Sequence, residues 1–316
     1  MTWVYLSGGV GGARLLYGLH SLLPADALTA VVNTGDDFVH WGLRICPDLD
    51  TVMYTLAGLS DWQRGWGLKD EGDRAQQMMA RYGAEDWFQL GDRDLATHIR
   101  RTELLQTHDL TTVTQMLYRG LGVRRQVLPM THAAVATTMV TRDGRHLPFQ
   151  HWFVRERCRP PLNGIQQSGD FEDNPHVLSA LQTAELVIIG PSNPYVSIAP
   201  ILFGSTTRAL IQEKPIVAMS PLIGGRAVKG PLAQMITQLQ GKAANNGQLV
   251  DIYESMLGRP LSGFIQDESD PPPRLPHTRV HLATTLMRNA RDSQRLATAI
   301  LPFLQQCAAA GPGATP

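Results

Sequence analysis

Four glycines near the start of the chain have the spacing of a loop that holds phosphate. The apolar run Trp3–Leu6 leads through Ser7 into Gly8, Gly9, Gly11 and Gly12, and leucines at helical spacing follow at once. A strand that turns into a helix through glycines presents backbone N–H groups at the positive end of the helix dipole, where phosphate binds well. We expect these glycines to bind the phosphates of a nucleotide. A tight turn that simply needs small residues is the alternative.

The glycine loop matches neither of the two common nucleotide-binding loops. A dinucleotide fingerprint that begins at Gly9 needs its third glycine at position 14, where Arg14 stands. A Walker loop that begins at Gly8 needs Gly-Lys-Ser/Thr at positions 13 to 15, where the chain has Ala-Arg-Leu. The sequence therefore argues against a standard NAD enzyme and against a P-loop NTPase.

Two polar segments bring four carboxylates within fifteen positions, Asp36 and Asp37 in the first segment and Asp48 and Asp50 in the second. Paired carboxylates beside a phosphate loop suggest Mg²⁺, because this hard cation takes oxygen ligands and shares them with substrate phosphates. We expect Asp37 and Asp50 to hold Mg²⁺ and to be catalytic, with Asp36 and Asp48 as alternates. The alternative is that Asp48 or Asp50 caps a helix at Thr51–Leu56.

Two further loops supply polar and cationic side chains. Gly190–Pro194 contains Ser192 and Asn193, and a later glycine-rich loop contains Arg226 and Lys229. Guanidinium and ammonium groups neutralise phosphate charge. We expect these four side chains to bind the nucleotide or its phosphates.

A third group combines aromatic rings with charges. Trp66 and Trp87 could form a wall for a flat aromatic ligand, and the guanidinium plane of Arg93 could stack on the same ligand. In that case Asp92 and Asp94 would orient Arg93. The alternative is a solvated charge cluster at the start of a helix, in which Asp94 is the N-cap.

The elements that must position these residues are short buried strands. Thr29–Val32, Glu185–Ile189 and Pro215–Met219 are apolar runs, and each stops in a polar loop rich in turn residues. This layout is typical of an α/β fold, a Rossmann-like doubly wound and mostly parallel sheet. Ligands of such sheets bind beyond the carboxyl ends of the strands, which is where the loops described above fall.

The middle of the chain has a different pattern. Helical periodicity extends from about Gly58 to Gly122, and Val135–Val140 and Leu147–Val154 alternate like paired antiparallel strands joined by an Asp-Gly turn. We interpret residues 1–57 and 176–316 as the nucleotide- and phosphate-binding core. Residues 58–175 are interpreted as an inserted helical and hairpin subdomain that forms the acceptor side of the cleft.

Composition excludes several classes of function. Acidic and basic residues balance at 28 each in 316 residues, so no overall field attracts nucleic acid or a membrane surface. The three cysteines are far apart, which fits a reduced compartment. No apolar stretch is long enough to span a bilayer, and the chain starts directly with a strand pattern. We expect a cytoplasmic protein that forms a homodimer and binds neither nucleic acid nor membrane.

With these residues in view, the chain resembles the 2-phospho-L-lactate transferase family of coenzyme F(420) biosynthesis. The resemblance runs almost from end to end and is carried by ordered motifs. They are SGGVGGARL at Ser7–Leu15, VVNTGDD at Val31–Asp37, CPDLDTVMYTLAG at Cys46–Gly58, GWGLKDE at Gly65–Glu71, WFQLGDRDLATHI at Trp87–Ile99, LPFQHWFVRE at Leu147–Glu156, GPSNP at Gly190–Pro194 and SPLIGGRAVKGP at Ser220–Pro231.

The resemblance implies a Mg²⁺-dependent transfer between two bulky substrates. A phosphorylated three-carbon acid arrives as its guanosine diphospho-ester, the terminal ribityl hydroxyl of the deazaflavin Fo attacks the phosphorus nearer the acid, and GMP leaves. Catalysis of such a step rests on positioning and charge neutralisation. Trp66, Trp87, Arg93 and Asp50 are the expected acceptor-binding residues, Asp50 through the ribityl hydroxyls as an alternative to metal.

One segment departs from the family pattern. Where members read Pro-Met-Ser-Asp-Asp, this chain has Pro-Met-Thr-His-Ala at positions 129 to 133. The donor acid is therefore open among 2-phospho-L-lactate, phosphoenolpyruvate and 3-phospho-D-glycerate. A nucleotide-sugar-binding regulator of the same superfamily is the alternative function, and a nicotinamide oxidoreductase is a more distant one.

Overall fold

All seven strands of the central sheet run parallel in this computed structural model, which describes residues 2–311. The strand order is β14-β13-β10-β9-β1-β2-β5. The strands are β1 (Trp3–Ser7), β2 (Leu28–Val32), β5 (Val127–Pro129), β9 (Leu186–Ile189), β10 (Ile216–Met219), β13 (Gly263–Asp267) and β14 (Arg279–Ala283). The three strands expected from apolar runs are β2, β9 and β10, and the α/β fold with a parallel sheet is confirmed.

The order of the strands reverses at β1. The chain passes from β1 to β2 on one side and later returns to β9 on the other side. In open α/β sheets the ligand crevice lies at such a switch point, beyond the carboxyl ends of the strands. Gly8 follows β1 and Ser192 lies shortly after β9, so both residues are placed at that crevice.

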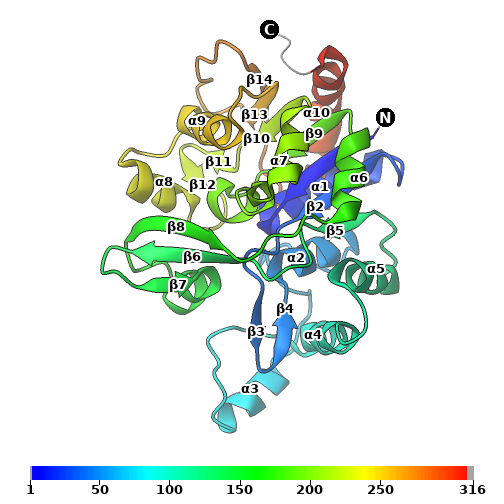
Figure 1. Cartoon of the computed structure of the whole chain (residues 1–316), viewed down its shortest axis with the longest axis vertical. Coiled ribbons are helices and arrows are strands. Elements are labelled where there is room, and N and C mark those ends of the chain that lie inside the picture. The colour runs from blue at the N-terminus through cyan, green and yellow to red at the C-terminus, as the bar shows by residue number, and fades with distance from the viewer. Residues whose placement is uncertain (1, 312–316) are drawn as a thin grey trace.

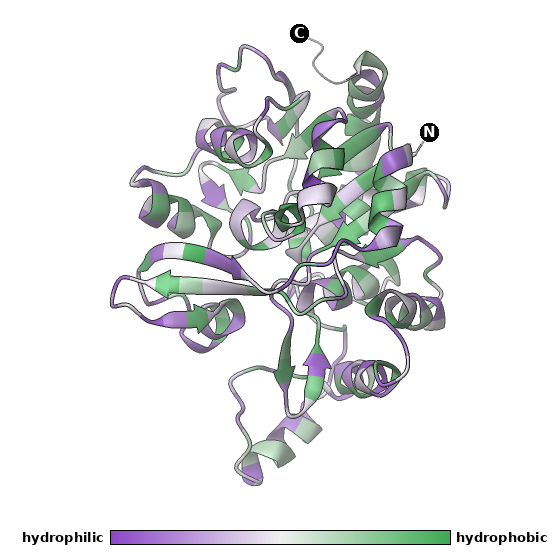
Figure 2. Ribbon diagram, viewed as in Figure 1, coloured by the Kyte–Doolittle hydropathy of each residue, from purple (hydrophilic) through white to green (hydrophobic). Residues whose placement is uncertain are grey.

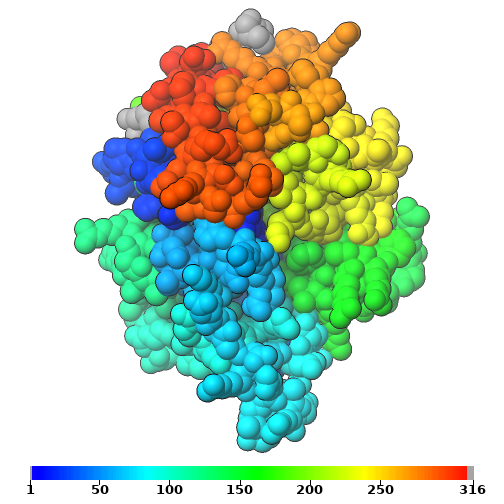
Figure 3. All heavy atoms as spheres, turned by 180° about the vertical axis from the view of Figure 1, so that it is seen from behind, coloured from blue at the N-terminus to red at the C-terminus, as the bar shows by residue number. Residues whose placement is uncertain are grey.

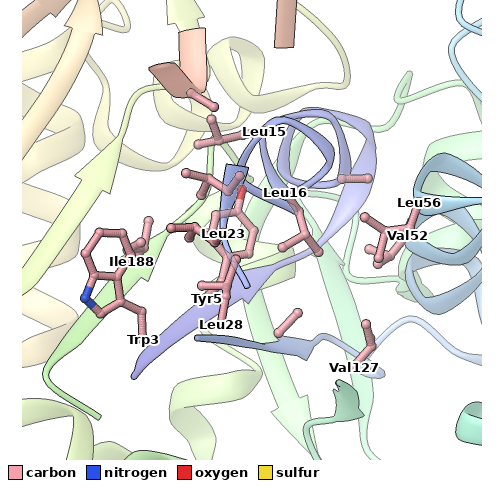
Figure 4. Close-up of a cluster of buried hydrophobic side chains, with 14 of the residues drawn as sticks. Trp3, Tyr5, Leu15, Leu16, Leu23, Leu28, Val52, Leu56, Val127 and Ile188 are labelled. Carbon is pink, nitrogen blue, oxygen red and sulfur yellow. The ribbon is translucent and has the colours of Figure 1, made fainter. Parts of the chain in front are cut away.

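Alternating side chains of β1 belong to two hydrophobic cores, one on each face of the sheet. Trp3 and Tyr5 belong to one core, and Val4 and Leu6 belong to the other. Because successive side chains of a strand point to opposite faces, an almost continuous apolar run fills both cores. Figure 4 shows the first core, in which Tyr5 and Leu28 of the sheet lie beneath Leu15 and Leu16.

Helices cover both faces of the sheet (Figure 1). Side chains in the first core come from α1 (Gly9–Leu22), α2 (Pro47–Leu56), α5 (Leu110–Gly120) and α10 (Ala290–Ala310). Side chains in the second core come from α6 (Pro175–Thr183), α7 (Ser205–Gln212), α8 (Leu232–Gln240), α9 (Asn246–Leu257) and the short helices η2 (Pro194–Ile198) and η3 (Ile201–Phe203). The strands of the sheet are correspondingly green in the hydropathy colouring of Figure 2.

A smaller group of elements extends from the carboxyl end of β2, and we call it the lower lobe. It consists of the hairpin β3 (Phe38–His40) and β4 (Leu43–Ile45) with α3 (Arg74–Arg81) and α4 (Asp92–Leu104). The lobe forms the lower end of the molecule in Figure 1 and again in Figure 3. The sequence did not predict the β3–β4 hairpin, because strands of three residues carry almost no periodic signal.

The expected antiparallel pair is present only in part. β6 (Ala136–Thr141) pairs with β7 (His146–Pro148) around the predicted turn, but β7 is short and the chain then forms the π-helix η1 (His151–Arg155). β6 also pairs with β8 (Leu162–Ser168), which the sequence did not predict. A second small hairpin, β11 (Leu222–Ile223) with β12 (Arg226–Ala227), follows β10.

The division of the chain into a core (residues 1–57 and 176–316) and an insertion (residues 58–175) remains a prediction. One strand of the insertion belongs to the central sheet. β5 lies within the span assigned to the insertion, yet it pairs with β2 as an edge strand of the central sheet. Helical periodicity in that span also covers less than expected, since Trp62 and Trp66 lie in a loop between α2 and α3. None of the helices in residues 2–311 combines the length and the apolar character needed to cross a membrane.

Candidate active site

Three loops meet at the carboxyl edge of the sheet. The backbone N–H of Gly8 donates to Ser192 Oγ at 3.2 Å, and the Ser192 hydroxyl donates back to the Gly8 carbonyl at 2.8 Å. Asn33, the first residue after β2, is fully buried beside them and donates to the carbonyl of Val196 at 3.1 Å. The loops after β1, β2 and β9 are thus joined by hydrogen bonds at the switch point.

Two of the four predicted aspartates share one amide group at this junction. Asn33 Nδ2 donates to Asp36 Oδ1 at 2.7 Å and to Asp48 Oδ2 at 2.9 Å. The second oxygen of Asp48 accepts the backbone N–H of Gly9 at 2.6 Å, and the second oxygen of Asp36 accepts Gln150 Nε2 at 2.9 Å. We call Asp36 and Asp48 the acid pair.

Both carboxylates of the acid pair are held where ionisation is unfavourable. Burial raises the pKa of Asp48 to about 6. Burial, and then repulsion from Asp48 and Asp37, raises the pKa of Asp36 well above its usual value. Within residues 2–311 neither carboxylate forms an ion pair with a basic side chain. Two adjacent carboxyl groups without a basic partner are a suitable donor set for Mg²⁺, whose charge would favour their ionised forms.

The other two predicted aspartates already have cationic partners. Asp37 Oδ2 lies 3.3 Å from Arg44 Nη2, although burial outweighs this contact and raises the Asp37 pKa to about 7. Asp50 is bound through both oxygens by Arg101, with Nη1 at 3.0 Å from Oδ2. An arginine therefore contacts each of these carboxylates. The geometry favours the alternates Asp36 and Asp48 as metal ligands over Asp37 and Asp50.

A second cluster of possible ligands fits a metal less well. One atom each of Asp50, Asp94 and His98 lies within 4.8 Å of the others. However, Arg101 Nη1 lies 3.0 Å from Asp50 and 3.2 Å from His98 Nδ1, so a guanidinium already supplies the positive charge there. A divalent ion in this cluster would have to displace a buried cation.

The glycine loop has fewer free amides than its sequence suggests. The N–H groups of Gly8 and Gly9 have protein partners, which leaves those of Val10 and Gly11 in the first turn of α1, where a helix has no intrahelical acceptors. Gly11 is also required for packing, since a Cβ there would lie 2.4 Å from the carbonyl oxygen of Pro191. The phosphate-binding and packing explanations for the glycines therefore apply together.

Of the two predicted cations, Lys229 contacts the loop that lines the hollow described below, whereas no contact connects Arg226 to the site within residues 2–311. Lys229 is exposed, and its Nζ donates to the carbonyl of Arg64 at 3.1 Å, in the loop between α2 and α3. The same loop is held by Arg14, which donates to the carbonyl of Trp62 at 2.7 Å and stacks over its ring. Arg226 is exposed on β12. Asn193 caps η2 through its side-chain oxygen, so its position is explained by local structure.

A small hollow lies between the glycine loop and the loop after α2. Val10 and Arg14 of α1, Tyr54 of α2, and Gly65 and Trp66 are among the residues that line it. A larger cavity of about 210 Å³ lies between the end of α5 and β5, and none of the predicted site residues lines it. The acid pair and the loop junction do not line this hollow, but Val10 in the first turn of α1 does, so the hollow lies beside the glycine loop.

The residues predicted for the acceptor side lie in separate environments. Trp66 is 43% exposed, with the guanidinium of Arg64 4.5 Å from its ring centre. Trp87 packs into an aromatic cluster of the lower lobe with Phe38, Phe88, His40 and His151. Arg93 is exposed, and its guanidinium donates to the carbonyl of Lys69. The described contacts do not join these three residues into one surface.

The expectation that Asp92 and Asp94 orient Arg93 is wrong. Asp92 accepts the backbone N–H groups of Arg74 at 3.3 Å and Ala75 at 2.9 Å, and so holds the start of α3. Asp94 points into the lower lobe, where its Oδ1 accepts the Tyr54 hydroxyl at 2.6 Å. Successive residues of a helix point in different directions, so neighbours in sequence do not face one another.

The helix-capping alternatives for Asp48, Asp50 and Asp94 are also wrong. Cys46 precedes the first turn of α2 and Gly91 precedes α4, so all three aspartates lie inside helices. Asp48 and Asp50 both belong to the first turn of α2, which begins at Pro47 rather than at position 51.

Sequence reasoning missed several buried polar residues of the site. The i, i+4 and i+7 spacing of Asp94, His98 and Arg101 places them on one face of α4 and could have indicated a cluster. Asn33 stands directly after a buried strand in the same loop as Asp36, which is also a signal. Gln150 lies 114 positions from Asp36 and gave no signal.

Comparison with known sequences identifies relatives that match most of the chain. The family model described as 2-phospho-L-lactate transferase CofD matches residues 4–276. The 2-phospho-L-lactate transferase of Methanopyrus kandleri is 37% identical over 305 residues, which cover 95% of this chain and 97% of the relative. The phosphoenolpyruvate transferase of Thermobifida fusca is 38% identical over 285 residues, 85% of this chain and 87% of the relative.

A solved structure has the same fold at low sequence identity. A member of the UPF0052 family from Bacillus halodurans superposes with a TM-score of 0.64 and 14% identity, covering 95% of this chain and 99% of that chain. A likeness at this identity concerns the arrangement of strands and helices, and it carries no information about substrates.

Proposed function

Because the chain belongs to the 2-phospho-L-lactate transferase CofD family, we propose that it transfers a phosphorylated three-carbon acid from a guanosine diphospho-ester to the deazaflavin Fo. GMP is the leaving product, and the new phosphodiester is the first form of coenzyme F(420) or a variant of it. We further propose that the reaction depends on Mg²⁺.

The acid pair beside the glycine loop is the observation that supports this proposal most strongly. Asp48 accepts the amide of Gly9 at 2.6 Å and shares Asn33 with Asp36. A diphosphate brought to this helix N-terminus meets two carboxylates, and it needs a cation between itself and them. Mg²⁺ held by Asp36 and Asp48 would supply that charge and neutralise the phosphate oxygens during transfer.

The remaining residues have proposed roles on either side of the phosphate. The amides of Val10 and Gly11 would bind the donor's phosphates, and we propose that Lys229 and Arg226 balance their charge. Trp66 lines the hollow beside the loop and is the favoured contact for the deazaflavin ring. Trp87 and Arg93 remain proposed acceptor residues at the lower lobe.

The donor acid stays open among three candidates. Relatives named 2-phospho-L-lactate transferase and phosphoenolpyruvate transferase have nearly equal identity to this chain. In the segment that departs from the family pattern, His132 Nε2 lies 2.6 Å from the Thr111 hydroxyl, and Thr131 donates to the carbonyl of Glu172 at 2.6 Å. These side chains are engaged with the protein, so their sequence alone does not assign the acid.

The test is product analysis by mass spectrometry. Purified protein receives Fo, GTP, Mg²⁺ and one of the three acids, together with a guanylyltransferase that makes the donor. The expected products are GMP and the phosphodiester of Fo with one preferred acid. Asp48→Asn serves as the inactive control. If the protein binds nucleotide-linked ligands but forms no phosphodiester with any acid, the regulator is the better description.

Two further expectations complete the proposal. We propose that the protein acts in the cytoplasm and as a homodimer. Light scattering behind a size-exclusion column measures the mass in solution, and a mass of one chain, 34.7 kDa, would contradict the dimer.

A further inference from the structure

A series of five side chains, which begins and ends on α2, joins this helix to α4 of the lower lobe. Asp50 and Tyr54 come from α2, and Asp94, His98 and Arg101 come from α4. Arg101 binds both oxygens of Asp50. On the other side of Arg101, its Nη1 lies 3.2 Å from His98 Nδ1, and His98 Nε2 lies 3.2 Å from Asp94 Oδ2. The Tyr54 hydroxyl donates to Asp94. We call these five residues the charge ring.

The charge ring contacts the first turn of α2, which also carries Asp48 of the acid pair. Asp48 and Asp50 are two positions apart in the first turn, so they lie about 200° apart around the helix axis. Asp48 faces the glycine loop and Asp50 faces α4. Any rotation of this turn that loosens Asp50 from Arg101 also displaces the Asp48 carboxylate from Gly9 and Asn33.

Local sequence favours the start of this helix, through Pro47 at its first position and two acidic residues in its first turn, but it supplies no side-chain cap. The residue before α2 is Cys46, which makes no side-chain capping bond to the first turn. The side-chain contacts that orient the turn come from distant segments. Besides Arg101, the Tyr118 hydroxyl of α5 donates to the carbonyl of Leu49 at 2.6 Å. Arg101 also reaches the carbonyl of Arg44 in β4 at 3.3 Å, so one guanidinium connects three elements.

His98 sets the orientation of that guanidinium. Its side chain is 2% exposed, and it lies between Arg101 and Asp94. A carboxylate facing Nε2 favours the tautomer with the proton on Nε2, which leaves the lone pair of Nδ1 to accept from Arg101. With this acceptor in place, the guanidinium plane is directed at Asp50.

We propose that Arg101 and His98 are positioning residues, which keep the first turn of α2 oriented so that Asp48 faces Asp36 across Asn33. They touch neither substrate nor metal. The inference rests on the proposed function, since it assigns a consequence for the metal site formed by the acid pair. Residues that orient metal ligands typically change metal affinity by 10- to 100-fold when they are removed.

Two near-isosteric variants of His98 separate its two contacts. The amide oxygen of Asn can take the place of Nδ1 and still accept from Arg101, whereas Gln places its amide near Nε2, facing Asp94, and loses the acceptor for Arg101. Mn²⁺ is titrated into the full chain in excess GDP, and bound Mn²⁺ is measured by electron paramagnetic resonance. We expect His98→Gln to weaken Mn²⁺ binding by about tenfold or more. His98→Asn should stay near the wild-type affinity.

Thermal unfolding of both variants distinguishes positioning from simple stabilisation. Wild-type Mn²⁺ affinity in His98→Gln, together with a lowered Tm, would show that the charge ring only stabilises the lobe. Equal weakening in both variants would overturn the role of Nδ1. If His98→Gln fails to fold, Arg101→Lys, which keeps the charge but not the paired contact, must weaken Mn²⁺ binding for the inference to stand.

The wild-type titration separates this inference from the proposed function. A wild-type protein that binds no Mn²⁺ in the presence of GDP contradicts the proposed metal site, and the inference fails with it. A wild-type protein that binds Mn²⁺ while His98→Gln binds it equally well contradicts the inference alone.

Discussion

Asp48→Asn and Asp50→Asn are the same substitution two positions apart in α2, and we expect them to shift the free energy of unfolding in opposite directions. Asp48 is buried without a basic partner, whereas Asp50 is bound by Arg101. The first change removes a charge that burial disfavours. The second change leaves a buried guanidinium without its carboxylate, which typically costs 3–5 kcal/mol.

The expected magnitude for Asp48 follows from its pKa. Burial raises that pKa from 3.8 to about 6, so the folded chain binds more protons than the unfolded chain between these pH values. Stability contributed by this group therefore falls as the pH rises through that window. At about 1.4 kcal/mol per pKa unit, the loss is roughly 3 kcal/mol at pH 8 in the metal-free protein.

The gain from Asp48→Asn is smaller than this loss. The new amide can satisfy either Gly9 or Asn33 but faces the other donor with its own N–H groups, which costs about 1–2 kcal/mol. We therefore expect a net stabilisation of roughly 1–2 kcal/mol at pH 8 and almost no net change at pH 5, where the loss from the raised pKa is only about 1.6 kcal/mol and the amide cost cancels it.

Urea unfolding of the metal-free proteins at pH 5 and pH 8 measures these differences. Turnover of the Asp48→Asn variant should fall by about 10²-fold or more, by analogy with the loss of one electrostatic stabiliser. If Asp48→Asn destabilises the protein at pH 8 as much as Asp50→Asn does, Asp48 is not an uncompensated acid and the reasoning fails.

Three further substitutions test other parts of the site. Gly11→Ala should destabilise the fold by about 1–3 kcal/mol, because the new Cβ meets the Pro191 carbonyl at 2.4 Å; an unchanged Tm would contradict this packing. Lys229→Gln should raise the KM for the donor more than that for Fo, and steady-state kinetics with each substrate varied would detect the reverse. Arg93→Ala should raise the KM for Fo with GDP affinity intact by calorimetry; unchanged Fo kinetics would remove Arg93 from the acceptor site.

The sequence predicts the sheet well because buried parallel strands leave a strong local signal. β2, β9 and β10 are nearly continuous apolar runs that end in turn residues, and burial on both faces requires that composition. The β3–β4 hairpin and η1 carry no such signal. Their side chains pack on residues from distant segments, as in the contact between Trp87 and His151.

The site was predictable as a set of loops but not as a set of contacts. The sequence placed Asp36, Asp37, Asp48 and Asp50 together, since all four follow strands or begin a helix near one edge of the sheet. It did not distinguish their roles, because the same residue type occupies all four positions. Their roles differ because their hydrogen-bond partners differ. Arg101 binds Asp50 from 51 positions away, and Gln150 binds Asp36 from 114 positions away.

The contact between Asp48 and Gly9 alters what the glycine loop can do by itself. A helix N-terminus attracts phosphate through its free amides and its dipole, but here a carboxylate accepts the first amide of α1 and lies at the same end. An anionic donor approaching Val10 and Gly11 must come close to that carboxylate and to Asp36. A divalent cation between them would convert this repulsion into attraction, which is the physical reason for our proposal that the reaction depends on Mg²⁺.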